Sequence, residues 1–287
     1  MVSNTQEILR KAKAGHYGVG SFNTSDPKVM EAILKAADDL KSPVIVETSE
    51  GEVNFSGPKV MVAAFLELAE KISVPCVLHL DHGKSFEVIE RVIRAGYRSV
   101  HFDGSKLIFS ENVSTTKRVV ETAKPLGIFV EAELGNIPGV SVLHTSSIQD
   151  VVGNLQKTDP QQAADFYDQT KVDCLATSVG NVHGIYSNKK PIDFDLIKKI
   201  RDSVPCFLSL HGSSGIGVSD LKRAIECGMT KININTELRQ AYLSTLREQL
   251  ASDPNEIRPY EVFPPALLAV ENVVKEKIMA VGSDGKG

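Results

Sequence analysis

The sequence lacks the features that mark membrane, secreted and nucleic-acid-binding proteins. No apolar run approaches the ~20 residues that a helix needs to cross a bilayer. Residues 1–6 show no basic-then-apolar signal segment. With 32 Lys and Arg against 36 Asp and Glu, the net charge is −4, which argues against a general nucleic-acid binder. These absences predict a cytoplasmic protein with no membrane and no nucleic-acid partner.

Cysteine is scarce, and its spacing forms no CxxC pair. The four cysteines are Cys76, Cys174, Cys206 and Cys227. The first three fall inside apolar segments that we predict to be strands. We therefore expect small buried side chains in a reducing compartment.

What the sequence does contain is a regular alternation of apolar strands and helices. Its 287 residues would suit two average domains or one α/β barrel. Strands are predicted near 18–23, 43–48, 75–80, 98–102, 127–132, 172–178, 205–210 and 230–234. Helices are predicted at 5–14, 27–41, 58–72, 85–95, 111–124, from 160, and at 193–202, 218–227, 237–251 and 265–280.

Eight strands, each followed by a helix, predict parallel pairing and a closed (β/α)8 TIM barrel, an α/β single domain over 1–287. An open doubly wound sheet is the alternative, but Gly18-Val19-Gly20 lies within a strand and lacks the rest of GxGxxG. The one long stretch without predicted structure, about 136–159, has the length of a mobile active-site loop.

Three of the apolar segments end in His-Gly. They are His82-Gly83, His183-Gly184 and His211-Gly212. In a barrel, strands deliver their last residues to one rim, so these histidines are expected to meet. Three neutral imidazoles with one open position are typical of a catalytic zinc site. Asp81, beside the first ligand, is placed for proton transfer.

Other polar residues at the predicted strand ends complete one pocket. Gly212-Ser213-Ser214-Gly215 follows the seventh strand, and Asn233 to Thr236 follow the eighth and open a helix. Small residues and a helix N-terminus favour a phosphate here, although Ser and Gly also simply make turns. Asn23 and Ser49 end the first two strands.

The remaining carboxylates and histidines carry weaker signals. Asp103 and Glu133 are either interior carboxylates that accept hydrogen bonds or a second metal position. His79 is expected in the core, supporting the site from below. His16, His101 and His144 are expected to be structural or exposed, and His101 alternates with Phe102, which we expect to point inward.

Seven segments together resemble the class II, metal-dependent fructose-bisphosphate and tagatose-bisphosphate aldolases. The resemblance runs through nearly the whole chain. The segments are Gly20-Ser21-Phe22-Asn23, Thr48-Ser49-Glu50-Gly51, Leu80-Asp81-His82-Gly83, Glu131-Ala132-Glu133-Leu134-Gly135, Gly180-Asn181-Val182-His183-Gly184, Leu210-His211-Gly212-Ser213-Ser214-Gly215 and Asn233-Ile234-Asn235-Thr236-Glu237-Leu238.

The resemblance implies a role for each matching residue. His82, His183 and His211 would bind one Zn2+, Asp81 would move the proton of the C4 hydroxyl, and Asp103 with Glu133 would match a secondary metal position. The residues implied to hold the substrate, with Na+ or K+ often near its phosphate, are Asn23, Ser49, Gly184, Gly212, Ser213, Ser214, Asn233 and Thr236.

The implied reaction is reversible cleavage of a ketose 1,6-bisphosphate, fructose 1,6-bisphosphate first, into dihydroxyacetone phosphate and glyceraldehyde 3-phosphate. Cleavage would break the C3–C4 bond, and Zn2+ would stabilise the negative charge that develops. The resemblance also implies a homodimer or homotetramer. Tagatose bisphosphate differs only in configuration at C4 and remains an alternative substrate.

The chain departs from the family pattern in the loop after the fifth strand. Relatives carry a Glu-Asp pair there, and one glutamate exchanges the C3 proton. Residues 135–145 hold no carboxylate here. His144 or Asp150 would be the nearest replacement. Arg258, of this chain or of a neighbouring one, is a candidate to reach the distal phosphate.

Three other functions remain open at this stage. The altered loop leaves open a low-activity or non-catalytic homologue that binds metal and sugar phosphate. Another metal-dependent barrel enzyme, such as a hydrolase, would use the same three histidines. A Schiff-base aldolase would use Lys231, in the last strand, and leave those histidines without a role.

Overall fold

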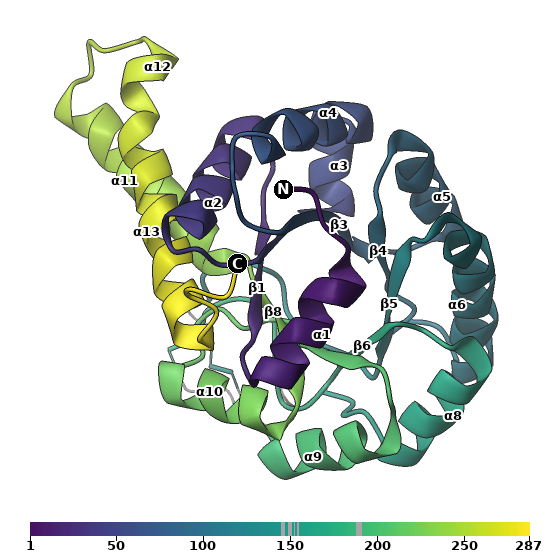
Figure 1. Cartoon of the computed structure of the whole chain (residues 1–287). Helices are drawn as coiled ribbons and strands as arrows, with labels where there is room; N and C mark the ends of the chain where they lie inside the picture. The colour runs from purple at the N-terminus through teal and green to yellow at the C-terminus, as the bar shows by residue number, and fades with distance from the viewer. Residues whose placement is uncertain (145–146, 149–150, 152, 154, 188–190) are drawn as a thin grey trace.

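The computed structural model describes residues 1–144, 147–148, 151, 153, 155–187 and 191–287. Eight parallel strands close into a barrel in the order β1 to β8 (Figure 1). The strands are β1 (Val19–Asn23), β2 (Val44–Ser49), β3 (Cys76–Gly83), β4 (Ser99–Phe102), β5 (Phe129–Leu134), β6 (Cys174–Thr177), β7 (Phe207–Leu210) and β8 (Met229–Ile234). The prediction of a (β/α)8 barrel is confirmed, and the open sheet is excluded because β1 pairs with β8.

Helices surround the barrel and follow the predicted order. They are α1 (Thr5–Gly15), α2 (Pro27–Asp39), α3 (Glu50–Ser56), α4 (Pro58–Ala69), α5 (Phe86–Ala95), α6 (Phe109–Ala123), the 3-10 turn η1 (Lys124–Leu126), α8 (Pro160–Thr170), α9 (Phe194–Ser203), α10 (Val218–Cys227), α11 (Thr236–Ser252), α12 (Pro259–Val262) and α13 (Pro264–Val281). None of the described helices combines the length and apolar character that a bilayer crossing requires.

Strand residues alternate between two environments because successive side chains point to opposite faces of a strand. Leu78 and Leu80 of β3 belong to the large apolar core between barrel and helices. Val77, His79 and Asp81 take the other face and point into the barrel. Every strand therefore contributes one apolar row outward and one mixed row inward.

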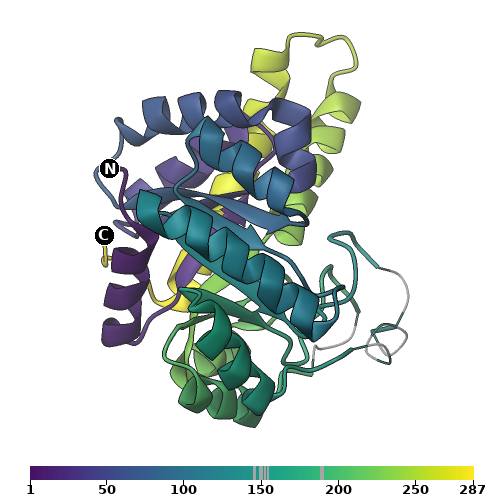
Figure 2. The ribbon, with the colours of Figure 1, turned by 90° about the vertical axis from the view of Figure 1, so that its right-hand side faces the viewer.

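The inward rows change character along the barrel axis. At the amino ends of the strands, Val19, Ile45 and Phe129 form an apolar cluster with Ile8 and Leu9 of α1. Helix α1 lies across this end of the barrel (Figure 1). Both chain termini lie on the same side as α1, opposite the loop that follows β5 (Figure 2).

Two short helices were not predicted. Helix α3 begins with a capping box in which the Ser49 hydroxyl and the Glu52 side chain each accept from the other residue's backbone N–H. Helix α12 connects α11 to α13 along the chain. Helices α11 and α13 pack together and project from the barrel as an arm (Figure 1). Arg258 pairs with Glu256 on this arm and does not line the main cavity of its own chain.

Candidate active site

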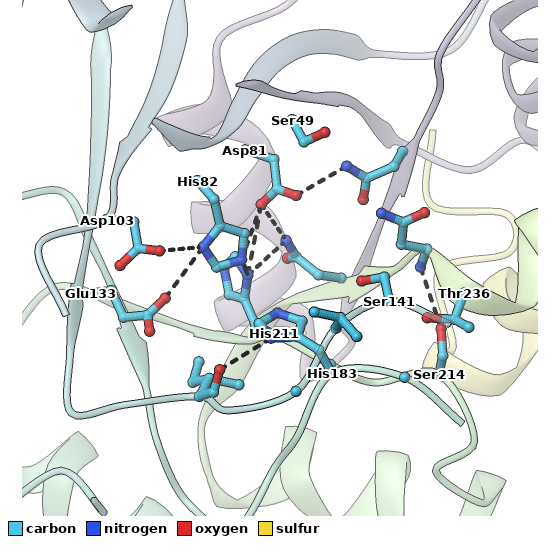
Figure 3. Close-up of a pocket in the computed structure, with 18 of the residues that line it drawn as sticks. Ser49, Asp81, His82, Asp103, Glu133, Ser141, His183, His211, Ser214 and Thr236 are labelled. Carbon is cyan, nitrogen blue, oxygen red and sulfur yellow. Dashed lines mark hydrogen bonds and ion pairs between the residues drawn. The ribbon is translucent and has the colours of Figure 1, made fainter. Parts of the chain in front are cut away.

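A cavity of about 370 Å3 opens at the carboxyl ends of the strands. Thirteen of the fourteen residues predicted for the site line it; Ser213 is the exception. Ser213 is buried, and its hydroxyl donates to the Leu210 carbonyl oxygen at 2.9 Å, so it stabilises the turn that follows β7. The imidazoles and carboxylates gather on one side of the cavity, and Ser214 and Thr236 lie on the other (Figure 3).

The end of β3 places Asp81 and His82 at the centre of the cavity. Asn23 donates to Asp81 Oδ2 at 3.0 Å, and Asn233 donates to Oδ1 at 3.4 Å. Burial would raise the pKa of Asp81, but His82, the two further imidazoles beside it and Lys231 hold that pKa well below its usual value. Asp81 is therefore a fixed carboxylate at the floor of the cavity.

His82 occupies an unusual backbone conformation. Its φ of 49° is left-handed, which costs a non-glycine residue about 1–2 kcal/mol. The β3–β4 register shifts between Leu80 and Gly83, and His82 lies inside this irregularity. The irregularity turns the His82 side chain toward Asp103 and Glu133, whose carboxylates lie 3.0 and 3.5 Å from Nδ1.

The three histidines predicted as metal ligands converge. Nε2 of His82 and Nδ1 of His211 are 3.0 Å apart. The His183 ring lies 5.1 Å from the His82 ring and 6.4 Å from the His211 ring, centre to centre. His183 Nδ1 donates to the Ile137 carbonyl oxygen at 3.2 Å, and His211 Nε2 donates to Glu131 at 2.8 Å. In each of these two rings the protonated nitrogen is thus the one that bonds the oxygen, and the other nitrogen carries the lone pair that a metal would need.

The donor set fits a divalent cation. In the described chain, atoms of Asp81, His82, His101 and His211 lie within 4.8 Å of one another, and so do atoms of His82, Asp103 and Glu133. Burial disfavours a charged imidazole, yet Asp81, Asp103 and Glu133 raise the pKa of His82 to about 10. The carboxylates therefore stabilise positive charge at this point. Imidazoles with carboxylates are ligands that zinc and its neighbours accept.

His101 is a site residue that sequence reasoning missed. We expected it to be structural or exposed and Phe102 to point inward. The structure shows the reverse: Phe102 packs in the core against the helices, and His101 is fully buried beside the His82 and His211 rings. Side chains two residues apart along a strand point to the same face, so the position of Asp103, which we predicted at the site, indicated that His101 points there too.

A charged layer supports the site from below. Lys231 Nζ lies 2.6 Å from Glu47 and 3.0 Å from Glu131, and all three side chains are fully buried. Burial would lower the pKa of Lys231, but the two carboxylates raise it above its ordinary value. A protonated amine is not a nucleophile, so this geometry argues against the Schiff-base alternative. His79 lies in the same layer, as expected, 3.3 Å from Glu131, and burial and Lys231 lower its pKa to about 4.

The opposite wall is built from backbone and small side chains. Gly212 has a φ of 60°, and a Cβ there would meet the Val182 carbonyl oxygen at 2.4 Å. Helix α11 begins beside it, and the Ser214 hydroxyl accepts from the backbone N–H of Asn235 and of Glu237 at 3.3 and 3.4 Å. Asn235, which lines the cavity, has a buried Oδ1 with no hydrogen-bond partner among the described residues. The helix N-terminus in this wall suits an anion, whereas the unpartnered Asn235 oxygen, an acceptor, suits a hydrogen-bond donor or a cation.

Three basic side chains at the rim of the cavity were not predicted from the sequence. Lys84, Lys106 and Arg239 line the cavity. Arg239 lies 2.6 Å from Glu52, which accepts from Asn23 at 3.2 Å, so the rim is linked to Asp81. Exposed basic residues are common on helices and after strands, so the sequence offered no signal that separates these three from the rest.

The loop after β5 lies along the segment after β6. Ile185 accepts from His144 N–H at 2.9 Å, and Pro138 accepts from His183 N–H at 2.8 Å. Ile137, Gly139, Val140 and Ser141 line the cavity. His144 does not line it: its ring stacks on Tyr186 at 4.3 Å, and its Nε2 donates to the Val140 carbonyl oxygen. The described geometry does not favour His144 as the missing base, and Asp150 lies outside the described residues.

Comparison with known proteins agrees with this geometry over the whole chain. Residues 3–286 match the family model described as "Fructose-bisphosphate aldolase class-II". A fructose-bisphosphate aldolase of Thermus caldophilus is 39% identical over 303 aligned residues, covering 98% of both chains. One of Geobacillus stearothermophilus is 41% identical over 285, covering 98% of this chain and 97% of its own.

A solved structure shares the fold as well. The crystal structure of the YdjI aldolase from Escherichia coli K12 superposes with a TM-score of 0.86 at 34% identity, covering 100% of this chain and 99% of that one. The histidine-lined cavity at the rim of a closed barrel and the match along the chain lead to one conclusion. The chain belongs to the class II fructose-bisphosphate aldolase family and is an aldolase, a carbon–carbon lyase.

Proposed function

We propose that the protein is a zinc-dependent aldolase that reversibly cleaves a ketose 1,6-bisphosphate, fructose 1,6-bisphosphate first, to dihydroxyacetone phosphate and glyceraldehyde 3-phosphate. The supporting observation is the convergence of His82, His183 and His211 on one cavity beside Asp81. The two relatives above are named for fructose bisphosphate, which supports the choice of substrate.

His82, His183 and His211 would hold the ion, with Asp103 and Glu133 available as a second position. When bound, the ion supplies Lewis-acid stabilisation of the negative charge that develops on the substrate as the C3–C4 bond breaks. Asp81 accepts the proton of the C4 hydroxyl, and Asn23 and Asn233 hold both of its oxygens in place. The glycine and serine wall at α11 binds one phosphate, and Arg239 on the rim is available to the other. A monovalent cation beside the first phosphate remains a prediction.

One observation favours a second candidate, a low-activity or non-catalytic binder of sugar phosphates. The described residues of the loop bring no carboxylate to the cavity, whose lining carboxylates are Asp81, Asp103 and Glu133. The C3 proton then has no acceptor of the usual kind. Tagatose 1,6-bisphosphate is the alternative substrate if fructose 1,6-bisphosphate is not cleaved.

A coupled retro-aldol assay separates these candidates. Purified protein is assayed with fructose 1,6-bisphosphate before chelation, after chelation and after zinc is restored, beside the Asp81→Asn variant. Cleavage that chelation abolishes and zinc restores is the expected result. Asp81→Asn should bind zinc normally and lose about 10²–10⁴-fold in kcat, because it removes the proton acceptor.

One outcome of the same assay would contradict the proposed function. Folded, zinc-loaded protein that cleaves neither bisphosphate would contradict the aldolase proposal for these substrates. Binding of dihydroxyacetone phosphate by that protein, measured by calorimetry, would then support the second candidate.

We also propose that the protein is a homo-oligomer located in the cytoplasm. The arm of α11, α12 and α13 exposes Ile257, Tyr260 and Leu268, an apolar surface that a second copy would cover. Four free, buried cysteines suit a reducing compartment. Light scattering on the intact chain tests the first point; a monomer at micromolar concentration would contradict it.

A further inference from the structure

We propose that His101 is a positioning residue, whose imidazole holds the backbone of His82 in the conformation that directs this ligand toward the metal. The inference rests on the proposed metal role of His82. It extends that role to a neighbouring strand and to a residue that would not itself touch the substrate.

The backbone of His82 needs such a support. Four non-glycine residues of the described chain have a positive φ: His16, Lys41, His82 and Lys171. His16 and Lys171 cap the C-termini of α1 and α8, and Lys41 follows the C-cap residue of α2, positions where left-handed residues are common. His82 alone lies inside a strand, where this conformation interrupts the ladder of hydrogen bonds.

His101 provides the missing partner. The His82 backbone N–H donates to Nδ1 of His101 at 3.2 Å, across from β3 to β4. The nearest carboxylate oxygen to that nitrogen, Oδ1 of Asp81, is 3.9 Å away and too distant for a hydrogen bond. The acceptor at Nδ1 is therefore committed to the backbone of His82.

This bond also determines the tautomer of His101. A neutral imidazole that accepts at Nδ1 carries its proton on Nε2. Nε2 lies 3.9 Å from Oε2 of Glu133, and neither atom has a hydrogen-bond partner among the described residues. The ring thus lies between the strained backbone of one predicted ligand and a carboxylate of the second predicted metal position.

Packing strengthens the connection. The His101 ring is fully buried, with its centre 4.8 Å from the His82 ring and 4.9 Å from the His211 ring. Gly83 lies against the same segment, since a Cβ there would meet the His101 carbonyl oxygen at 3.1 Å. A displaced His101 would therefore move His82 through both its backbone and its ring.

Two substitutions at position 101 separate positioning from packing. His101→Leu keeps most of the volume and removes the acceptor at the δ1 position. His101→Asn keeps an oxygen acceptor near that position and loses volume. A positioning role predicts that Leu impairs metal binding and that Asn preserves it, whereas a packing role predicts the opposite order.

The measurements are the zinc dissociation constant by chelator competition and hydrogen exchange at the His82 amide in the metal-free protein. We expect His101→Leu to bind zinc about 10–100-fold more weakly, the usual range when a residue that orients a ligand is lost. The His82 amide should exchange faster in this variant and stay protected in His101→Asn. In ¹⁵N spectra of the wild type, the His101 Nδ1 resonance should be that of an unprotonated nitrogen.

Phe102→Leu is the matched control, because Phe102 is equally buried on the same strand, packs in the core against the helices and has no side-chain group that could bond to His82. It should lower stability and leave zinc affinity unchanged. A wild type that binds no zinc would overturn the proposed function and this inference with it. A zinc-binding wild type whose His101→Leu variant matches it in affinity and His82 exchange would overturn this inference alone.

Discussion

The two ends of the barrel interior are built from the same strands by opposite chemistry. At the amino ends, Ile45, Val77 and Phe129 pack under α1 without a polar group among them. At the carboxyl ends of the same strands, Ser49, Asp81 and Glu133 line the cavity. Because inward side chains recur every second residue, four positions along each of these strands separate the apolar core residue from the residue that lines the cavity.

The difference shows how one barrel serves both stability and chemistry. The apolar end loses water on folding and stabilises the closed barrel. The polar end gathers carboxylates and imidazoles, and burying such groups away from water costs free energy unless they are paired. In the layer between the two ends, Lys231 is paired in this way with Glu47 and Glu131. Each end should therefore respond differently to substitution.

The largest effect is expected at the carboxyl end. His183→Ala removes a proposed zinc ligand and should lower the retro-aldol rate by about 10³-fold or more, because the Lewis acid supplies several kcal/mol of charge stabilisation. Zinc content and kcat measure the loss. His16→Asn, at the C-terminus of α1, is the control and should change neither. Full activity in His183→Ala would contradict the ligand set.

The layer between the ends should show a large loss of stability. Lys231→Met leaves Glu47 and Glu131 buried without their cation, which costs about 3–5 kcal/mol in the free energy of unfolding. Urea denaturation measures this, with Lys117→Met on the surface of α6 as the control. A loss below 1 kcal/mol would show that the layer relaxes. In the wild type, borohydride should trap no adduct on Lys231; a trapped adduct would revive the Schiff-base mechanism.

At the amino end the response should be confined to stability. Leu9→Ala opens a cavity in the fully buried apolar cluster under α1 and should cost about 3 kcal/mol in the free energy of unfolding. Zinc affinity should stay at the wild-type value, because the cluster lies at the other end of the barrel. A parallel change in zinc affinity would mean that the two ends are coupled.

The smallest effect is expected outside the barrel. Hydrogen bonds from Lys275 and Lys35 lower the pKa of Asp39, which lies on the exposed end of α2. Its folded-state pKa is below its unfolded value, so its contribution is present at neutral pH and disappears as the pH falls through the folded-state value. Asp39→Asn should cost about 0.2–1 kcal/mol at pH 7.

The pH and salt dependence of that small difference is the sharper test. Urea midpoints of wild type and Asp39→Asn should converge at acid pH and in high salt, because the solvent screens this exposed pair. A difference that persists under both conditions would have to arise from packing.

Much of the fold and most of the site followed from the order of residues alone. Eight apolar segments alternating with helices predicted the barrel, and the barrel rule placed three His-Gly ends on one rim. These inferences succeed because strand period and connection handedness are local properties of the chain. The motifs that carried the resemblance are equally local, and the family they indicated is confirmed. The catalytic and ligand roles themselves stay predictions.

Tertiary structure alone decided the rest. The sequence shows that His101 and Phe102 face opposite ways, but only the closed barrel shows that His101 is the inward one and lies against the His82 backbone. Ser213 turns away from the cavity, and Arg239 reaches it from a helix, because loop and helix directions depend on how the strands are staggered. Periodicity therefore determined which residues could share a face, and barrel closure determined which of them meet.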